Sequence, residues 1–177
     1  MITGKHTFIR GTEPDDVPAL SRLYAAGTLR AGLLDARREP VLPTRDELRE
    51  LVSRKEIADG GYYTVEDRQG LVRGFCSLRG LNTEARYAEF SLNLLEPEDY
   101  ASALAEETAA FLYDRAYIRA GLLKVLAYCL EGEVELAAFL RAQGFESDGI
   151  QRDVVFTRGR WHALEAMSRT NRATGAA

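Results

Sequence analysis

Few side chains in this sequence are of the types that carry out metal or nucleophilic chemistry. The two cysteines, Cys76 and Cys129, both lie in apolar, strand-like runs. A free cysteine in such surroundings usually packs as a small buried hydrophobe, and we expect this of both. His6 and His162 are far apart in the chain, and no zinc-ligand spacing accompanies them. The sequence therefore predicts no metal site.

The net charge and the distribution of apolar residues disfavour two broad classes of partner, nucleic acid and membrane. The formal net charge of the 177-residue chain is −4, which disfavours nucleic acid as the main partner. No run approaches the ~20 apolar residues of a membrane helix, and the N-terminus lacks the apolar run of a secretory signal. We therefore expect a cytoplasmic protein that binds neither nucleic acid nor membrane.

Local patterns predict a mixed α/β chain in which residues 1–167 form a single domain and residues 168–177 form a frayed tail. Helix starts are expected at a capping box from Thr12 to Asp15, at a second one from Thr44 to Glu47, at Glu98 or Asp99, and after Gly132. Strands are expected over residues 7–10, 62–65, 74–78, 87–95 and 122–129, from 145 onward, and over 152–157. Arg158-Gly159-Arg160 is expected to turn, and Trp161 to pack against the sheet. The order predicts a mixed sheet of six to seven strands with helices on both faces.

Several spaced motifs in the second half resemble the GCN5-related N-acetyltransferases. Ala88-Glu89-Phe90 is similar to the family's Ala-Glu-small motif, and residues 122–127 are similar to its next strand. Residues 139–149 resemble its Leu-x-x-x-Gly-Phe-x-x-x-Gly ending, and the sequence after them resembles members that modify protein N-termini or polyamines. The resemblance implies a fold in which the fourth and fifth strands splay apart.

The same resemblance implies where acetyl-CoA, the acyl donor, would bind. The pantetheine arm would pair with the edge of the fourth strand, and the pyrophosphate would sit on amides at the start of the third helix. The family's pyrophosphate loop, Arg/Gln-x-x-Gly-x-Gly/Ala, becomes Glu98-Asp99-Tyr100-Ala101-Ser102-Ala103 here, so the loop is degenerate. The implied coenzyme-binding residues are Ser91, Leu92, Asn93, Leu94, Tyr100, Ala101, Ser102, Ala103, Leu104 and Glu133.

Two residues are the implied catalytic groups. Glu89, by its motif position, would be the base that deprotonates an attacking ammonium, directly or through water. Tyr128, on the strand beside the cleft, is the candidate acid. The alternatives are a structural role for Glu89, a packing role for Tyr128, and a Tyr100 that packs with a tethered hydroxyl. Ser102 would either donate to a phosphate or bond its own helix backbone.

Three functions remain open at this point. The first is an acyl-CoA-dependent N-acyltransferase in which an amine, on a small molecule or on a protein, attacks the thioester directly. The second is a catalytically inactive binding or assembly module of the same fold, favoured by Glu98, Ala101, Glu133 and Leu140, which replace residues that the family uses. The third is an acyltransferase with a carrier-protein-bound donor. A homodimer is compatible with all three. Arg30, Arg37 and Arg38 are interpreted as an exposed charged loop in preference to an acceptor-binding one.

Overall fold

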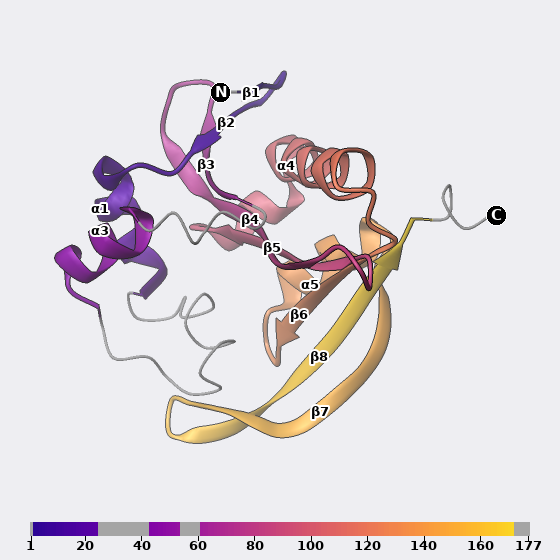
Figure 1. Cartoon of the computed structure of the whole chain (residues 1–177). Helices are drawn as coiled ribbons and strands as arrows, with labels where there is room; N and C mark the ends of the chain where they lie inside the picture. The colour runs from indigo at the N-terminus through magenta and orange to yellow at the C-terminus, as the bar shows by residue number, and fades with distance from the viewer. Residues whose placement is uncertain (1, 25–42, 54–60, 172–177) are drawn as a thin grey trace.

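The computed structural model describes residues 2–24, 43–53 and 61–171, and within them eight strands form one sheet (Figure 1). The spatial order is β1-β2-β3-β4-β5-β6-β8-β7. The strands are β1 (Ile2–Thr3), β2 (Thr7–Gly11), β3 (Tyr62–Asp67), β4 (Val72–Asn82), β5 (Tyr87–Leu94), β6 (Lys124–Leu130), β7 (Glu146–Thr157) and β8 (Arg160–Thr170). The sheet is mixed, as predicted, because β5 and β6 are parallel while the other neighbours are antiparallel.

Helical segments cover both faces of the sheet, which confirms the predicted layering (Figure 1). One face packs against α4 (Ala103–Tyr113) and α5 (Val134–Ala142), and buries the even-numbered residues of β5. The other face packs against η1 (Pro14–Asp16), α1 (Val17–Leu20), η2 (Ser21–Tyr24) and α3 (Arg45–Ser53). The remaining segments are the 3-10 turn η4 (Pro97–Ala101) and the π-helical η5 (Asp114–Arg119). We call the α4–α5 side the core face and the α1–α3 side the polar face.

The parallel pairing between β5 and β6 is short. It comprises Tyr87↔Lys124, Ala88↔Val125 and Glu89↔Leu126, although both strands continue for several residues beyond the last pair. The two strands therefore diverge after Glu89, and this is the predicted splay. The predicted fourth and fifth strands are β5 and β6 in the structure, because the two-residue β1 was not predicted and shifts the strand numbering by one.

Two carboxylates fix the N-terminal part of the fold. Glu107 of α4 accepts hydrogen bonds from the amides of Lys5, His6 and Thr7 at 2.9–3.1 Å, which ties the β1–β2 turn to α4. Asp16 is 5% exposed and accepts a hydrogen bond from each terminal nitrogen of Arg10, both at 2.7 Å. The amide of Glu13 and the hydroxyl of Thr64 also donate to Asp16, so one buried carboxylate joins β2, β3 and η1.

Helix starts were predicted with mixed success. The box at Thr44 and Glu47 is confirmed, since each side chain bonds the other residue's amide. The first box is displaced by one residue, because Glu13 is the N-cap of η1 and Asp16 accepts its amide. The prediction of Glu98 or Asp99 as the cap of the next helix is wrong, because both lie within η4 and Ser102 caps α4.

The C-terminal hairpin differs most from the prediction. Residues 146–157 form one strand with two register shifts, and residues 160–170 form a further strand that was not predicted. Residues 168–170 therefore belong to β8, since they pair with β6, and only later residues can form the predicted tail. Arg158 and Gly159 make the turn with φ of 51° and 73°, as in a tight type I′ hairpin. Trp161 is 54% exposed, so the prediction that it packs against the sheet is wrong.

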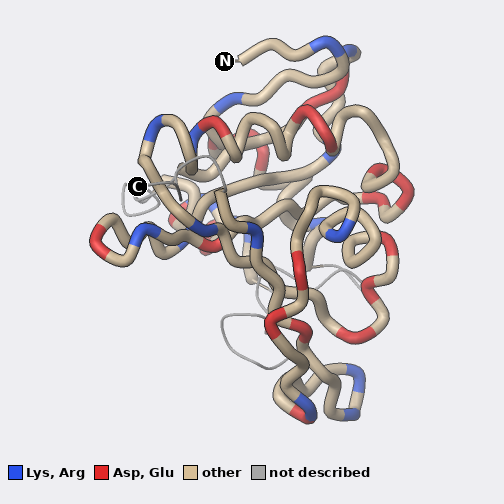
Figure 2. Tube along the Cα trace, turned by 90° about the vertical axis from the view of Figure 1, so that its right-hand side faces the viewer, with Lys and Arg blue, Asp and Glu red and all other residues tan. Residues whose placement is uncertain are grey.

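Acidic and basic segments are interspersed over the described chain, with basic residues gathered where the β7–β8 hairpin turns (Figure 2). Within the described ranges, no helix has both the length and the apolar character needed to cross a membrane. Cys76 and Cys129 are buried, as expected.

Candidate active site

The opening between β5 and β6 has Glu89 at its apex. Glu89 belongs to the last residue pair before the strands separate, and its partner Leu126 lies directly across from it. Side chains of paired residues in neighbouring strands point to the same face, and successive residues alternate between faces. Glu89 and Tyr128 therefore both project on the polar face, with Tyr128 two residues beyond the apex on β6. The structure thus brings the two predicted catalytic residues to one side of the opening.

A polar row continues from Glu89 along β5. Ser91 and Asn93 are both buried on this face, and the Asn93 amide nitrogen donates to the Ser91 hydroxyl at 3.0 Å. Ser77 of β4 lies opposite Ser91. Among the described residues, the Ser77 hydroxyl and the Asn93 amide oxygen are buried without a hydrogen-bond partner. Buried polar atoms usually find partners, so this row is a place where a polar ligand group would gain hydrogen bonds.

Arg79 and Tyr62 set the electrostatics around Glu89. Arg79 lies opposite Glu89 in the β4–β5 ladder, and its guanidinium is 3.8 Å from the carboxylate. Burial raises the pKa of Tyr62, with a further increase from Tyr24 and a partial offset from the positive charge of Arg79. Tyr62 therefore keeps its proton at neutral pH, and within the described ranges Arg79 and Glu89 form the ion pair on this part of the polar face.

The backbone edge of β5 inside the opening is defined by even-numbered residues. The Lys124 amide of β6 donates to the Arg86 carbonyl, whereas the Leu95 amide donates to Arg73 of β4. Peptide groups alternate in direction along a strand, so those of Leu92 and Leu94 face the opening and those of Ser91 and Asn93 face β4. The predicted ligand-pairing edge is therefore carried by the backbone of Leu92 and Leu94, while Ser91 and Asn93 contribute side chains to the polar row.

The hydroxyl of Tyr100 already occupies this edge. It donates to the Leu92 carbonyl oxygen at 3.0 Å and accepts from the Leu94 amide at 3.2 Å. Its ring packs against Phe139 of α5, with centroids 5.9 Å apart. The expected packing aromatic with a tethered hydroxyl is thus confirmed for Tyr100, and the tether attaches to the inner edge of β5.

Ion pairs hold η4 and its approach in place. Arg73 of β4 makes two hydrogen bonds with Asp99, at 2.6 and 3.0 Å, and Arg22 contacts Glu96 at 2.5 Å. Two of the acids that crowd the expected phosphate site are therefore paired with arginines, which reduces the negative charge there.

The start of α4 retains some capacity for an anion. Ser102 is the N-cap and accepts from the Ala105 amide at 3.4 Å, while its hydroxyl donates to the Asp99 carbonyl at 2.6 Å. The alternative in which Ser102 bonds its own helix backbone is thus confirmed. The amides of Ala103 and Leu104 lie in the first turn, where helix geometry provides no intrahelical partner. Ala101, the last residue of η4, takes the place of a glycine in the family loop.

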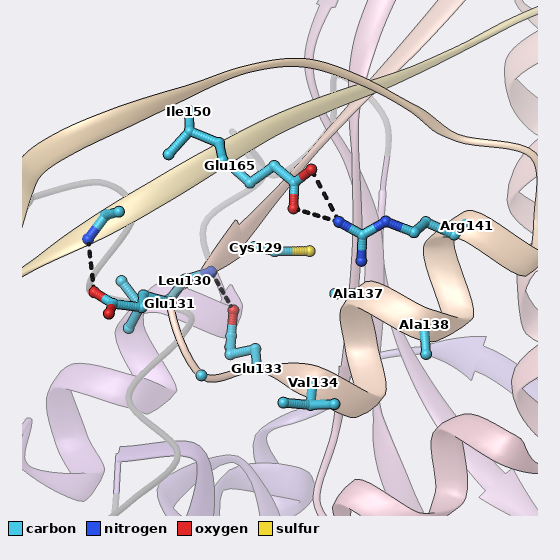
Figure 3. A pocket seen from close by; sticks show the side chains of 12 residues that line it. Cys129, Leu130, Glu131, Glu133, Val134, Ala137, Ala138, Arg141, Ile150 and Glu165 are labelled. Carbon is cyan, nitrogen blue, oxygen red and sulfur yellow. Dashed lines mark hydrogen bonds and ion pairs between the residues drawn. The ribbon is translucent and has the colours of Figure 1, made fainter.

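Glu133 lies away from the groups described above. Its carboxylate accepts the Leu130 amide at 2.6 Å, and it lines a cavity of about 350 Å³ between α5 and the β7–β8 hairpin (Figure 3). At 3.6 residues per turn, the cavity-lining residues Ala137 and Arg141 lie about 160° around α5 from Phe139, whose ring packs against Tyr100. An Arg141–Glu165 ion pair of 2.7 Å spans this cavity. Each of its acidic residues accepts a hydrogen bond: Glu131 from the Ala163 amide, Glu133 from the Leu130 amide and Glu165 from Arg141.

Two functional contacts were missed from the sequence. The position of Arg79 opposite Glu89 depends on the strand register, which no local motif reveals. The position of the Tyr100 hydroxyl depends on η4 folding back toward β5.

Leu140 is 1% exposed and part of the core, so it supplies no proton donor. Arg30, Arg37 and Arg38 lie outside the described residues. Within the described part of the chain, no cluster of three metal-ligating side chains occurs.

Comparison with known proteins identifies the fold. No protein-family model matches the sequence, and no curated protein matches it. Among solved structures, one named as a probable acetyltransferase is 24% identical, with a TM-score of 0.78 and coverage of 96% of both chains. The spermidine N-acetyltransferase of Vibrio cholerae, crystallised with CoA and spermine, is 21% identical, with a TM-score of 0.77. That alignment covers 94% of this chain and 96% of the other. With its splayed parallel strands and helices on both faces, the chain has the fold of the GCN5-related N-acetyltransferases.

Proposed function

We propose that this protein is an acyl-CoA-dependent N-acyltransferase that moves an acetyl group from acetyl-CoA to a primary amine. The observation that carries the proposal is the opening between β5 and β6, with a carboxylate, Glu89, at its apex. Acetyl-CoA supplies an activated thioester carbonyl. The similarity of the fold to amine acetyltransferases supports the same class of chemistry.

The residues of this chain fit such a donor in two places. The inner edge of β5 offers backbone groups at Leu92 and Leu94 to an extended, amide-bearing arm. The first-turn amides of α4, at Ala103 and Leu104, favour an anion through hydrogen bonding and the helix dipole. The Tyr100 hydroxyl must leave the edge to free the first of these places.

Catalysis would use groups on the polar face. Glu89 would take the proton from the attacking ammonium, whose ordinary pKa of about 10.4 leaves little free amine at neutral pH. The amine nitrogen then bonds to the acyl carbon and the carbon–sulfur bond breaks. Tyr128 would donate a proton to the leaving thiolate, and the second proton of the nitrogen would return to the Tyr128 oxygen, directly or through water. The backbone amide of Leu92 would polarise the thioester carbonyl, because it faces the opening, whereas the Ser91 amide faces β4.

The acceptor is proposed to be a small-molecule amine or a protein amino group. The negatively charged Glu89 and the unpartnered oxygens of Ser77 and Asn93 suit a donor-rich cationic group. The known neighbours that act on spermidine or spermine make polyamines the first acceptors to test.

A second candidate is a catalytically inactive module of the same fold. The observation that favours it is the Tyr100 hydroxyl, which occupies the edge that a donor would use. A donor attached to a carrier protein remains a third candidate, because the altered loop matters less when no free nucleotide is bound.

Calorimetric titration with acetyl-CoA, followed by a thiol-release assay over a panel of amines, tests the proposal. Micromolar binding and amine-dependent release of CoA are the expected results. Absence of acetyl-CoA binding at millimolar concentration, together with absence of thiol release, would exclude the proposed activity and leave the other two candidates. Transfer from an acylated carrier protein would then separate those two.

A further inference from the structure

The inner edge of β5 is the part of the opening with the most defined chemistry. An edge strand presents unpaired amide and carbonyl groups, and an extended ligand binds such an edge by pairing with them. In this chain, the Leu92 carbonyl and the Leu94 amide are both bonded to one side chain, Tyr100, from the turn that follows the same strand. The hydroxyl thus donates to a carbonyl and accepts from an amide, as a ligand amide would.

We propose that Tyr100 is an intramolecular occupant of the donor site and sets the affinity for the phosphopantetheine arm, which binds only when the hydroxyl leaves β5. This inference rests on the proposed function, because it assumes a pantetheine-bearing donor. The arm is an extended chain with two amides, and its source is either free CoA or a carrier protein.

Three further contacts show that the position of Tyr100 is built into the fold. Its ring lies against Phe139, so part of its surface is withdrawn from water. The neighbouring Asp99 is held by Arg73 through two hydrogen bonds, with the two side chains 15% and 28% exposed. On the other side, Ser102 caps α4 and donates to the Asp99 carbonyl. The loop is therefore anchored at both ends, and the hydroxyl can leave by rotation of the side chain alone or by release of Asp99.

Competition between Tyr100 and the arm predicts a change in donor affinity opposite to that predicted for an ordinary ligand contact. If Tyr100 competes with the arm, removing its hydroxyl raises donor affinity, because the ligand no longer has to break two hydrogen bonds. If Tyr100 instead contacts the ligand, removal lowers affinity. An occupied edge also reduces the observed affinity in proportion to the fraction of molecules in which the site is open.

The decisive variant is Tyr100→Phe, which keeps the ring on Phe139 and removes only the hydroxyl. Tyr117→Phe is the control, because Tyr117 is a buried tyrosine whose hydroxyl also donates to a backbone carbonyl, that of Arg169, on a different part of the fold. Arg73→Gln, which releases Asp99, is a second route to the same open state.

Hydrogen exchange tests the occupancy without any ligand. The Leu94 amide should exchange faster in Tyr100→Phe than in the wild-type protein. The Leu95 amide should not change, because it donates to Arg73 of β4. Equal exchange at Leu94 in both proteins would overturn the proposal.

Calorimetry with CoA and with pantetheine tests the competition. We expect Tyr100→Phe to bind both probes about tenfold more tightly than the wild type, since two ordinary hydrogen bonds no longer compete. Arg73→Gln should shift affinity in the same direction, and Tyr117→Phe should leave it unchanged. Equal affinity for pantetheine and CoA would indicate that the nucleotide is not bound, and would identify a carrier protein as the source of the arm.

The two ways of failing are distinct. If the wild type binds CoA or pantetheine and Tyr100→Phe binds it equally or more weakly, the role of Tyr100 is refuted while the proposed function stands. If neither probe binds the wild type, Tyr100→Phe or Arg73→Gln at millimolar concentration, the pantetheine-bearing donor is refuted and this inference falls with it.

Discussion

Replacing Glu89 by Gln separates a catalytic carboxylate from a structural one. The side chain is nearly isosteric and loses only its charge and its basicity. Its ion pair with Arg79 is long, at 3.8 Å, and the two side chains are 25% and 35% exposed. Ion pairs of this kind contribute about 0.2–1 kcal/mol to stability, so the free energy of unfolding should change by less than about 1 kcal/mol.

The expected effect on turnover is much larger. A positioned general base contributes about 10²- to 10⁴-fold to the rate, which corresponds to about 3–5 kcal/mol of activation free energy. Comparing the change in activation free energy with the change in unfolding free energy therefore decides whether Glu89 is catalytic or structural. We expect kcat to fall at least about a hundredfold, with donor affinity and thermal stability close to those of the wild type.

The assay is thiol release from acetyl-CoA at saturating donor, with spermidine as the first acceptor. Glu84→Gln is the control, because Glu84 is an exposed carboxylate in the turn between β4 and β5. Unchanged turnover in Glu89→Gln would remove Glu89 from the mechanism. A loss of turnover matched by a comparable loss of stability would mean that the carboxylate acts only through its pairing with Arg79.

Three further predictions concern stability and reactivity. Asp16→Asn should destabilise the protein by about 1–3 kcal/mol in urea unfolding at pH 7, because the Arg10 guanidinium loses one of its two carboxylate partners and keeps only Glu66. Burial alone would raise the pKa of Asp16, but hydrogen bonds from Arg10, the Glu13 amide and Thr64 lower it overall from its ordinary value of 3.8. Its contribution is therefore fully present well above the ordinary pKa of 3.8 and is lost as the pH falls through the lowered pKa, so the difference between variant and wild type should shrink in acid; a constant difference would contradict this. Leu112→Ala should cost about 2–5 kcal/mol, since Leu112 is a residue of α4 that is 0% exposed, and a change below about 1 kcal/mol would show that the core relaxes around the cavity. Burial raises the pKa of the Cys76 thiol, so the native protein should react with a thiol reagent at Cys76 only after unfolding; rapid labelling of the folded protein would contradict its burial.

Much of the sheet could be predicted because its strands have strong local signals. Apolar-rich runs at residues 87–95 and 122–129 predicted β5 and β6, and the capping box at Thr44 and Glu47 predicted the start of α3. The extent of β7 and β8 could not be predicted in this way. Most of β7 is exposed on both faces, so it lacks the alternation of a half-buried strand, and pairing with β8 is what makes it extended.

The candidate site was predictable only as a set of positions. The motif around Ala88 and Glu89 predicted the carboxylate, and the family resemblance predicted that a ligand would pair with the edge of the same strand. The position of Glu89 at the apex and the inner edge at Leu92 and Leu94 come from the structure. The neighbours that complete the site come from tertiary structure. Arg79 faces Glu89 through the β4–β5 register, and Tyr100 reaches Leu92 because a 3-10 turn reverses the chain. The spacing of residues in the sequence carries no information about either contact.

The Tyr100 contact also bears on how the protein avoids self-association. A splay leaves an unpaired strand edge inside a sheet, and such an edge is a template for pairing with any extended segment, including one from another copy of the chain. By bonding the Leu92 carbonyl and the Leu94 amide, Tyr100 covers the part of that edge nearest to η4. A variant that opens the donor site would therefore also expose an aggregation-prone edge. Tighter donor binding and poorer colloidal stability should then appear together.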